Sequence, residues 1–281
     1  MNALFETKYI LKKYDIKPNK SLGQNFLVDD DTLEVISNKA NKDDLIIEIG
    51  PGIGTLTSLL LEKAKKVIAI ELDKNMIKIL NDRFKLYDNF ELINEDILKV
   101  NIEELIQKNN FSIENTKIIA NLPYYITTDI ITKLIKTKIK EINILIQKEV
   151  AQRLCAKTGT KDAGAITYYV KYYADVKKEK DVKASCFLPS PKVDSAFISI
   201  NKLENKRVKV ENEELFFKLI KENFSKRRKT LINSLSNVVE KEKLEQILLK
   251  LNINVNIRGE NLNIQDFANI CNEIEKGRKE D

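Results

Sequence analysis

The sequence predicts an α/β protein in which a Rossmann-like domain is followed by a small all-helical domain. Through the first two-thirds of the 281 residues, short apolar runs alternate with stretches of helical periodicity, which is typical of a parallel sheet with crossover helices. After residue 201 a charged stretch without apolar periodicity gives way to amphipathic segments that contain only two glycines, Gly259 and Gly277. We therefore expect a first domain at residues 1–203 and a second at residues 204–281.

The apolar pattern also places the individual elements. Short apolar runs predict strands at residues 45–49, 66–71, 90–93, 118–120 and 141–147. The segments between them have helical spacing, and helices are expected at residues 56–63, 75–83 and 127–134. Two later stretches, 165–173 and 196–200, are interpreted as strands near one edge of the sheet. In the second domain, the apolar residues from Phe216 to Ile220 begin the helical pattern.

The composition excludes several kinds of chemistry. The chain has no histidine, and its three cysteines lie far apart without a Cys-x-x-Cys pair, so we expect neither a metal site nor an imidazole base. Lys and Arg number 48 against 42 Asp and Glu, and the net charge of +6 mildly favours a polyanionic partner, although a lysine-rich composition alone can produce it. Residues 1–20 lack the apolar core of a signal peptide, and no apolar run has the length of a membrane span. We expect a cytoplasmic protein with no membrane partner.

A glycine-rich turn follows the first predicted strand. The run Gly50 to Gly54 reads Gly-Pro-Gly-Ile-Gly, which is not the spacing of the dinucleotide fingerprint, and such a turn alone is often only a tight connection. However, Glu71 closes the next strand about twenty residues on, where a carboxylate can bond ribose hydroxyls. Asp96 follows the third strand, in a position to accept from an adenine amino group. Together these features predict a nucleoside at the carboxyl ends of the strands.

A second motif, Asn121-Leu122-Pro123-Tyr124, follows the fourth predicted strand. An exocyclic aromatic amine is a poor nucleophile because its lone pair is delocalised into the ring. The Asn121 oxygen and a backbone carbonyl of this loop could accept both N–H groups and so free the lone pair for attack. Pro123 fixes the turn, and Tyr124 offers a ring on which a base can stack. A plain strand-to-helix turn is the alternative, but the glycine turn and this loop together resemble the amino-methyltransferases that use S-adenosyl-L-methionine (SAM).

The resemblance extends over nearly the whole chain. The segments at 21–27, beginning with Ser21, and at 147–153 and 187–196 are similar to motifs of the rRNA adenine N6-dimethyltransferases. Those at 223–231 and 258–262 resemble the branch that acts on small-subunit rRNA, the KsgA type. This resemblance implies SAM as the methyl donor and dimethylation of two adjacent adenosines near the 3′ end of 16S rRNA, within a precursor of the small ribosomal subunit. It also implies rRNA recognition by the helical domain, no metal, and a monomer.

The resemblance assigns roles to particular residues. It implies that the cofactor is contacted by Gln24, Asn25, Leu27, Gly50, Gly52, Glu71, Leu72, Asp96, Ile97 and Asn121. Catalysis would involve Asn121, Leu122, Pro123 and Tyr124, with Phe187 as a second aromatic face opposite Tyr124. Gly54 stands where some relatives have alanine, a difference that is expected to be harmless.

A basic run lies in the second domain. Lys226, Arg227, Arg228 and Lys229 are expected inside a helix, and for an rRNA substrate we favour phosphate contacts over a merely solvated face.

Two other functions are considered. One is a dimethylase of large-subunit rRNA, against which the segments at 223–231 and 258–262 argue. The other is a ribosome-assembly checkpoint in which methylation is incidental, and the sequence leaves this open because binding and catalysis can coexist.

Overall fold

The computed structural model describes residues 2–19 and 22–280, and Ser21 of the predicted cofactor-contacting segment therefore lies outside the described residues. The chain divides into two compact units. The first comprises Met1–Ala151 and Val176–Lys202, and the second Gln152–Asp175 and Leu203–Asp281. The second unit thus includes Gln152–Asp175, a segment that the sequence analysis assigns to the first domain.

A seven-stranded sheet forms the centre of the first unit, with the strand order β4-β3-β2-β5-β6-β9-β7. Its parallel part consists of β2 (Leu45–Ile49), β3 (Lys66–Glu71), β4 (Phe90–Asn94), β5 (Thr116–Asn121) and β6 (Glu141–Gln147). In register, Ile47 of β2 lies between Ile68 of β3 and Ile118 of β5. All residues of β2 are buried, since helices cover both faces of a parallel sheet.

The strand order reverses direction between β2 and β5. The chain moves outward from β2 through β3 to β4 and then returns to place β5 on the other side of β2. Ligands of open α/β sheets bind at the carboxyl ends of the strands at such a switch point. The fold therefore predicts a binding site beyond Ile49, Glu71 and Asn121.

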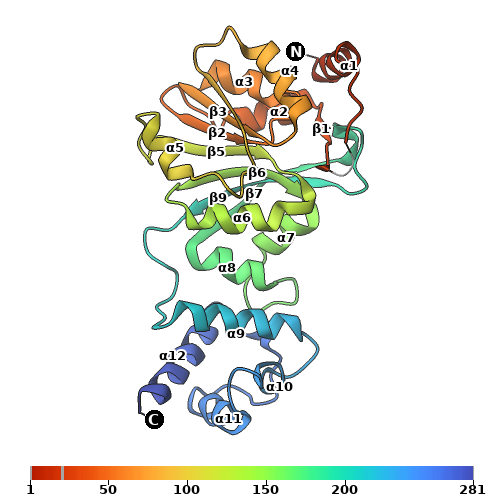
Figure 1. Cartoon of the computed structure of the whole chain (residues 1–281). Coiled ribbons are helices and arrows are strands. Elements are labelled where there is room, and N and C mark those ends of the chain that lie inside the picture. The colour runs from red at the N-terminus through yellow and green to blue at the C-terminus, as the bar shows by residue number, and fades with distance from the viewer. Residues whose placement is uncertain (1, 20–21, 281) are drawn as a thin grey trace. The chain divides into compact units, whose positions relative to one another are not determined.

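Helices cover the two faces of this sheet. Figure 1 shows α2 (Asp30–Ser37), α3 (Thr55–Lys63) and α4 (Lys74–Phe84) on one face and α6 (Thr127–Lys136) on the other. Aspartate side chains cap the N-termini of α2 and α4. Asp29 accepts from Thr32 N at 3.0 Å, and Asp73 accepts from Asn75 N at 2.9 Å. Among the described helices that precede α8, four were not predicted, namely α1 (Ala3–Lys13), α2, α5 (Ile102–Lys108) and α7 (Lys148–Cys155).

Two predictions near the sheet edge are corrected. Residues 165–173, expected as a strand, form helix α8 (Ala165–Tyr173). Its tyrosines favour strands by propensity, but Tyr168 and Tyr172 are four residues apart and both fully buried, which is helical spacing. The adjacent edge strand β7 (Ala174–Val182) was missed because its sequence is rich in charges, as edge strands often are. The strand expected at 196–200 is confirmed as β9 (Ser195–Lys202), antiparallel to β6.

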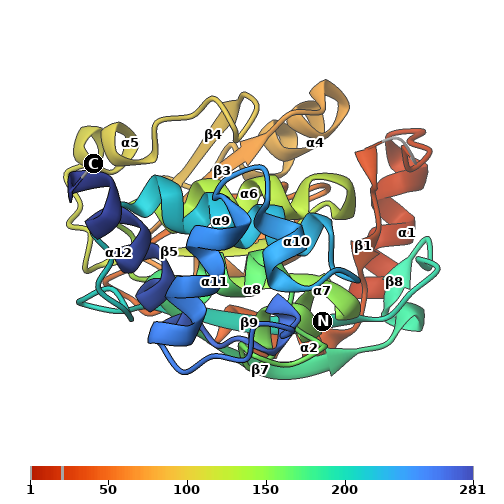
Figure 2. The same ribbon diagram turned by 90° about the horizontal axis from the view of Figure 1, so that it is seen from below.

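The second unit is helical, as predicted. Apart from α8 and the end of α7 (Lys148–Cys155), it consists of α9 (Glu213–Ser225), α10 (Leu231–Leu235), α11 (Lys241–Lys250) and α12 (Ile264–Glu280), which Figure 2 shows together. Phe216 of α9 and Phe267 of α12 are fully buried in one hydrophobic core with Tyr168 and Tyr172.

Neither unit offers a helix that could cross a bilayer: within the described residues, none combines sufficient length with sufficient apolar character. The described residues also contain no group of three or more histidine, cysteine or acidic side chains placed to hold a metal ion.

Candidate active site

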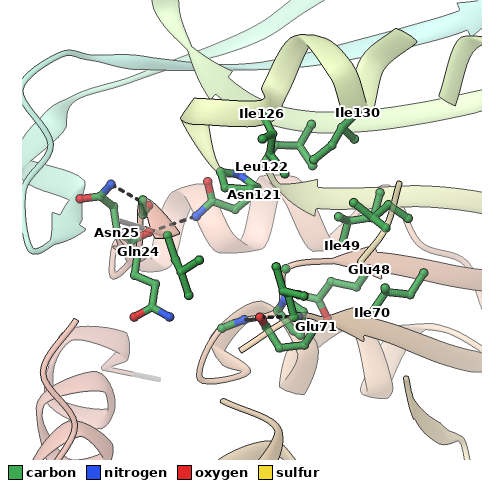
Figure 3. Close-up of a pocket in the computed structure, with 18 of the residues that line it drawn as sticks. Gln24, Asn25, Glu48, Ile49, Ile70, Glu71, Asn121, Leu122, Ile126 and Ile130 are labelled. Carbon is green, nitrogen blue, oxygen red and sulfur yellow. Dashed lines mark hydrogen bonds between the residues drawn. The ribbon is translucent and has the colours of Figure 1, made fainter. Parts of the chain in front are cut away.

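A pocket opens at the carboxyl ends of the central strands, where the switch point predicts it (Figure 3). It contains about 1080 Å³ of empty space, part of it open to solvent, compared with about 300–1000 Å³ for typical small-molecule sites. All residues predicted to contact the cofactor line it: Gln24, Asn25, Leu27, Gly50, Gly52, Glu71, Leu72, Asp96, Ile97 and Asn121. Of the residues predicted to act on the substrate, Leu122, Pro123 and Tyr124 also line the pocket, whereas Phe187 is absent from its wall.

The glycine turn forms the floor of this pocket. Gly50, Gly52 and Gly54 all have left-handed φ values, of 65°, 58° and 86°. A Cβ on Gly52 would lie 3.0 Å from the Phe26 ring, and one on Gly54 only 2.5 Å from the Phe84 ring. The turn is therefore glycine-specific here, and the space that an alanine at position 54 would need is filled by Phe84.

Glu71 lies at the end of β3 and is 8% exposed. Its Oε1 accepts from Leu72 N and Asp73 N, both at 2.8 Å, and its Oε2 accepts from Gly52 N at 3.2 Å. Burial raises the pKa of Glu71, and these backbone bonds oppose the rise. A carboxylate offers about four acceptor sites, so Oε2 keeps a free position for a ribose hydroxyl.

Hydrogen bonds fix the segment before β1 (Phe26–Leu27), which lines the pocket. Gln24 Oε1 accepts from Asn19 N, and Gln24 Nε2 donates to Asp73 Oδ2, each at 2.7 Å. The carbonyl oxygen of Asn25 accepts from Asn121 Nδ2 at 3.2 Å, a bond drawn in Figure 3. Gln24 thus uses both ends of its amide to hold the segment near the start of α4, while Asn25 joins it to the Asn-Leu-Pro-Tyr loop.

Asp96 and Ile97 follow β4 at the outer end of the pocket. Asp96 Oδ1 accepts from Leu98 N at 2.9 Å, which fixes the carboxylate and leaves Oδ2 as a further acceptor. Ile97 is buried beside it. This pair provides an acceptor next to an apolar surface, which suits the edge and the face of an adenine.

Glu48 was not singled out by the sequence analysis. It is the fourth of the five residues of β2, lines the pocket and is only 2% exposed. Burial raises its pKa to about 8; Thr57 Oγ1, which donates to Glu48 Oε2 at 2.7 Å, opposes the shift, and the nearby Glu71 adds to it. The sequence does contain a feature that could have identified Glu48, namely an acidic residue within an otherwise apolar strand. Such a group is rarely buried without a functional role or a bonded partner.

The Asn-Leu-Pro-Tyr loop lines the pocket next to the glycine turn, where a Cβ on Gly50 would lie 3.9 Å from Pro123 Cδ. Because Asn121 Nδ2 is held by the Asn25 carbonyl, the side-chain oxygen of Asn121 is left as the amide's acceptor. Leu122 N donates to Leu145 O at 3.0 Å, which anchors the loop to β6. The Pro123 carbonyl accepts from Thr127 Oγ1 at 2.9 Å, which anchors the loop to the start of α6.

The two predicted aromatic faces are placed differently. Tyr124 is half-buried, its hydroxyl lies 2.6 Å from Ser195 Oγ, and burial raises its pKa. Phe187, in the short strand β8 (Phe187–Leu188), is 3% exposed and pairs in register with Leu27. It therefore lies behind the pocket wall in this structure. Tyr125, which was not predicted, lines the pocket and is half-exposed.

The basic run lies between helices and not inside one, because α9 ends at Ser225 and α10 begins at Leu231. Arg227 Nε donates to Glu260 Oε2 at 2.7 Å, and Lys226 Nζ donates to Ser234 O at 3.3 Å. Both side chains are thus held by the protein. Arg228 and Lys229 are exposed, and their side chains have no hydrogen bond or ion pair among the residues described.

The lining of the pocket discriminates between nucleotide-like ligands. It contains the carboxylates of Glu71, Glu95 and Asp96, the buried acid Glu48, whose raised pKa keeps it protonated below about pH 8, and no lysine or arginine among the described residues. Such a lining disfavours a pyrophosphate and favours a nucleoside that carries positive charge, as SAM does at its sulfonium and ammonium groups. Glu71 and Asp96 offer acceptors of the kind that its ribose hydroxyls and adenine amine require.

The fold and this site together define a Rossmann-like methyltransferase that uses SAM. A family model described as ribosomal RNA adenine dimethylase matches residues 16–276. A "Ribosomal RNA small subunit methyltransferase A" from Clostridium acetobutylicum is 49% identical over 275 residues, covering 96% of this chain and 98% of that relative. The chain belongs to the ribosomal RNA adenine dimethylase family, whose methyl donor is SAM.

Solved structures show the same fold. A dimethyladenosine transferase from Plasmodium falciparum superposes with a TM-score of 0.74 at 29% identity, covering 89% of this chain and 98% of that one. The 23S rRNA methyltransferase ErmE superposes with a TM-score of 0.68 at 21% identity, covering 89% of this chain and all of that one. The predicted fold class is confirmed.

Proposed function

We propose that this rRNA adenine dimethyltransferase modifies N6 of two adjacent adenosines near the 3′ end of 16S rRNA, within a precursor of the small ribosomal subunit. The name of the Clostridium acetobutylicum relative, which aligns over almost the whole chain, supports the small subunit as the source of the substrate. The observation that carries the proposal is the Asn121 loop, whose amide oxygen lies on a pocket lined for a cationic nucleoside.

The chain's own groups would act by positioning and hydrogen bonding. When bound, SAM supplies a methyl group made electrophilic by the sulfonium. The Asn121 side-chain oxygen and the Leu122 carbonyl accept the two N–H groups of the adenine amine and free its lone pair. Because Asn121 is fixed through Asn25, and the loop through Leu145 and Thr127, these acceptors are held in place before the substrate arrives.

The target adenine must leave its stack to reach this loop. Tyr124 provides one aromatic face, held by its contact with Ser195. We retain Phe187 as the second face; its ring is 3% exposed and would have to become accessible to stack on a base. The proposal also includes a monomer that acts in the cytoplasm, and rRNA recognition by the helical residues 204–281.

The test is to map methylated adenosines in 16S rRNA from cells that lack this gene and carry a plasmid copy. The wild-type copy should restore N6,N6-dimethyladenosine at two adjacent positions. Asn121→Ala should reduce the rate by roughly 10²-fold or more, the typical cost of losing a preorganised hydrogen bond at the reacting group. Gln107→Ala, at an exposed position of α5, is the matched control. If the wild-type copy leaves the rRNA of these cells unchanged, the proposal is wrong.

The same cells distinguish the proposed function from the alternative of a ribosome-assembly checkpoint in which methylation is incidental. A folded Asn121→Ala protein that leaves the adenosines unmodified and still restores normal maturation of the small subunit would show that binding, and not methylation, is the main role.

A further inference from the structure

Helix α1 carries two aromatic residues and two lysines on one solvent face. Phe5, Lys8, Tyr9 and Lys12 are spaced i, i+3, i+4 and i+7, which places them in one stripe along the helix. Phe5 is 71% exposed and Tyr9 58%. The stripe is about 10 Å long, from the rise of a helix.

The opposite face of α1 packs against the first unit. The exposed stripe is therefore not the face by which α1 joins the hydrophobic core. Ala3 and Ile10 are buried in the core of the first unit. Ala3 N donates to Asp30 Oδ1 at 3.1 Å, and Glu6 forms an ion pair with Arg83. The helix therefore presents Phe5 and Tyr9 to solvent from a fixed position.

The charge beside the two rings is positive and uncompensated. Lys8 and Lys12 form no ion pair with any residue that the structure describes, and both are exposed. The nearby carboxylates are already engaged, Glu6 by Arg83 and Asp82 by Tyr14 and Lys13. Exposed lysines interleaved with exposed aromatic rings form the surface that single-stranded nucleic acids bind, because lysines contact phosphates and rings stack on bases.

The stripe is also connected to the active-site pocket. Asp30, which anchors the start of α1, is three residues beyond Leu27 in the pocket wall. The chain that leaves α1 reaches the pocket at Leu22, and Gln24 donates to Asp73. Both ends of α1 are thus linked to segments that line the pocket of Asn121.

We propose that the α1 stripe (Phe5, Lys8, Tyr9 and Lys12) binds a single-stranded segment of the rRNA that flanks the target adenosines. Lys8 and Lys12, one turn apart, contact successive phosphates, and Phe5 and Tyr9 stack on the bases between them. This inference rests on the proposed function. A second copy of this chain is the competing occupant, since an exposed aromatic pair can also mediate self-association.

The chain has no tryptophan, so one introduced on α1 reports on that position alone. In Phe5→Trp the ring is retained, and its fluorescence should be quenched by a synthetic RNA of the 3′-terminal region of 16S rRNA. Leu86→Trp is the matched control, because Leu86 is 85% exposed in the turn that precedes β4, at the amino ends of the parallel strands. Its fluorescence should not change with RNA.

The lysines are tested by the salt dependence of binding to small subunits from cells that lack this gene. Lys8→Gln with Lys12→Gln should lower the slope of log affinity against log salt by about 1.4–1.8, at 0.7–0.9 for each phosphate contact. Phe5→Ala with Tyr9→Ala should weaken binding by roughly 5- to 150-fold for each stacked base that is lost. The control pair is Lys42→Gln with Lys108→Gln, two exposed lysines that precede β2 and β5.

The outcomes separate this inference from the proposed function. If the wild-type protein methylates the subunits and the α1 variants bind like the control pair, the inference is wrong and the function stands. If the wild-type protein methylates no subunit, both the proposed function and this inference are wrong. If the aromatic variants change the sedimentation of the protein and not its affinity for RNA, the stripe is a self-association surface and the inference is overturned.

Discussion

The buried carboxyl of Glu48 makes a sharp prediction about stability and pH. Its pKa is raised from 4.5 to about 8 by burial near the carboxyl end of β2. Between these two values the folded protein keeps the proton, whereas the unfolded chain has lost it. The free energy of unfolding therefore contains a contribution from Glu48 that is fully present below about pH 4.5 and is lost as the pH rises toward 8.

The size of this loss follows from the same two values. Each unit of pH between them removes about 1.4 kcal/mol, so wild-type protein should lose roughly 4 kcal/mol from this group between about pH 5 and pH 8. Glu48→Gln keeps an oxygen that can accept from Thr57 Oγ1 and has no proton to lose. The variant should therefore become the more stable of the two proteins as the pH rises.

The assay is urea unfolding of both proteins at several pH values from about 5 to 9. Other ionisable groups are common to the two proteins and cancel in the difference of their unfolding free energies. Glu95→Gln, at an exposed carboxylate of the same pocket, controls for the loss of one negative charge. A difference between wild type and Glu48→Gln that stays constant with pH would refute the reasoning.

Three further predictions concern the cofactor, the glycine turn and the basic run. Glu71→Ala should weaken SAM binding by about 1.5–3 kcal/mol, the range for hydrogen bonds to a charged group, and calorimetry that shows unchanged affinity in the folded variant would remove Glu71 from the site. Gly54→Ala should lower the free energy of unfolding by about 2 kcal/mol or more, because Gly54 has a left-handed φ and a Cβ there would meet the Phe84 ring. In urea unfolding, the same substitution should cost less in a Phe84→Leu protein. Equal losses of unfolding free energy in both backgrounds would contradict the assigned contact. Arg228→Gln with Lys229→Gln should lower the salt slope of subunit binding by about 1.4–1.8 without changing SAM affinity, and coincident slopes would make the run a solvated surface.

The parallel strands could be predicted from the sequence because both of their faces are buried. Runs such as 45–49 are apolar at every position except Glu48, so length and composition identify them without any periodicity. The same reasoning failed for α8 and β7. In α8, tyrosine propensity was given more weight than the four-residue spacing, and in β7 the charges of an edge strand concealed an extended segment.

Much of the candidate site could be predicted because its residues follow strands. Gly50, Glu71 and Asn121 come at or directly after the ends of β2, β3 and β5, and parallel strands bring those ends together. The burial of Phe187 behind the pocket wall depends on its pairing with Leu27, far away in the sequence. Such a pairing leaves no local pattern.

The basic run shows a similar limit. The sequence predicts four available cations, but Arg227 is held by Glu260, which is 33 residues away. Only the structure shows that Arg228 and Lys229 are the two exposed members whose side chains have no hydrogen bond or ion pair among the described residues.

The most direct test of the central claim is a reconstituted reaction. Purified protein, SAM with a labelled methyl group, and small subunits from cells that lack this gene would be incubated together, and the rRNA digested and analysed by mass spectrometry. The account predicts four labelled methyl groups for each subunit, as N6,N6-dimethyladenosine at two adjacent positions near the 3′ end of 16S rRNA. A reaction that yields no dimethyladenosine there, or that labels large-subunit rRNA instead when both are supplied, would contradict it.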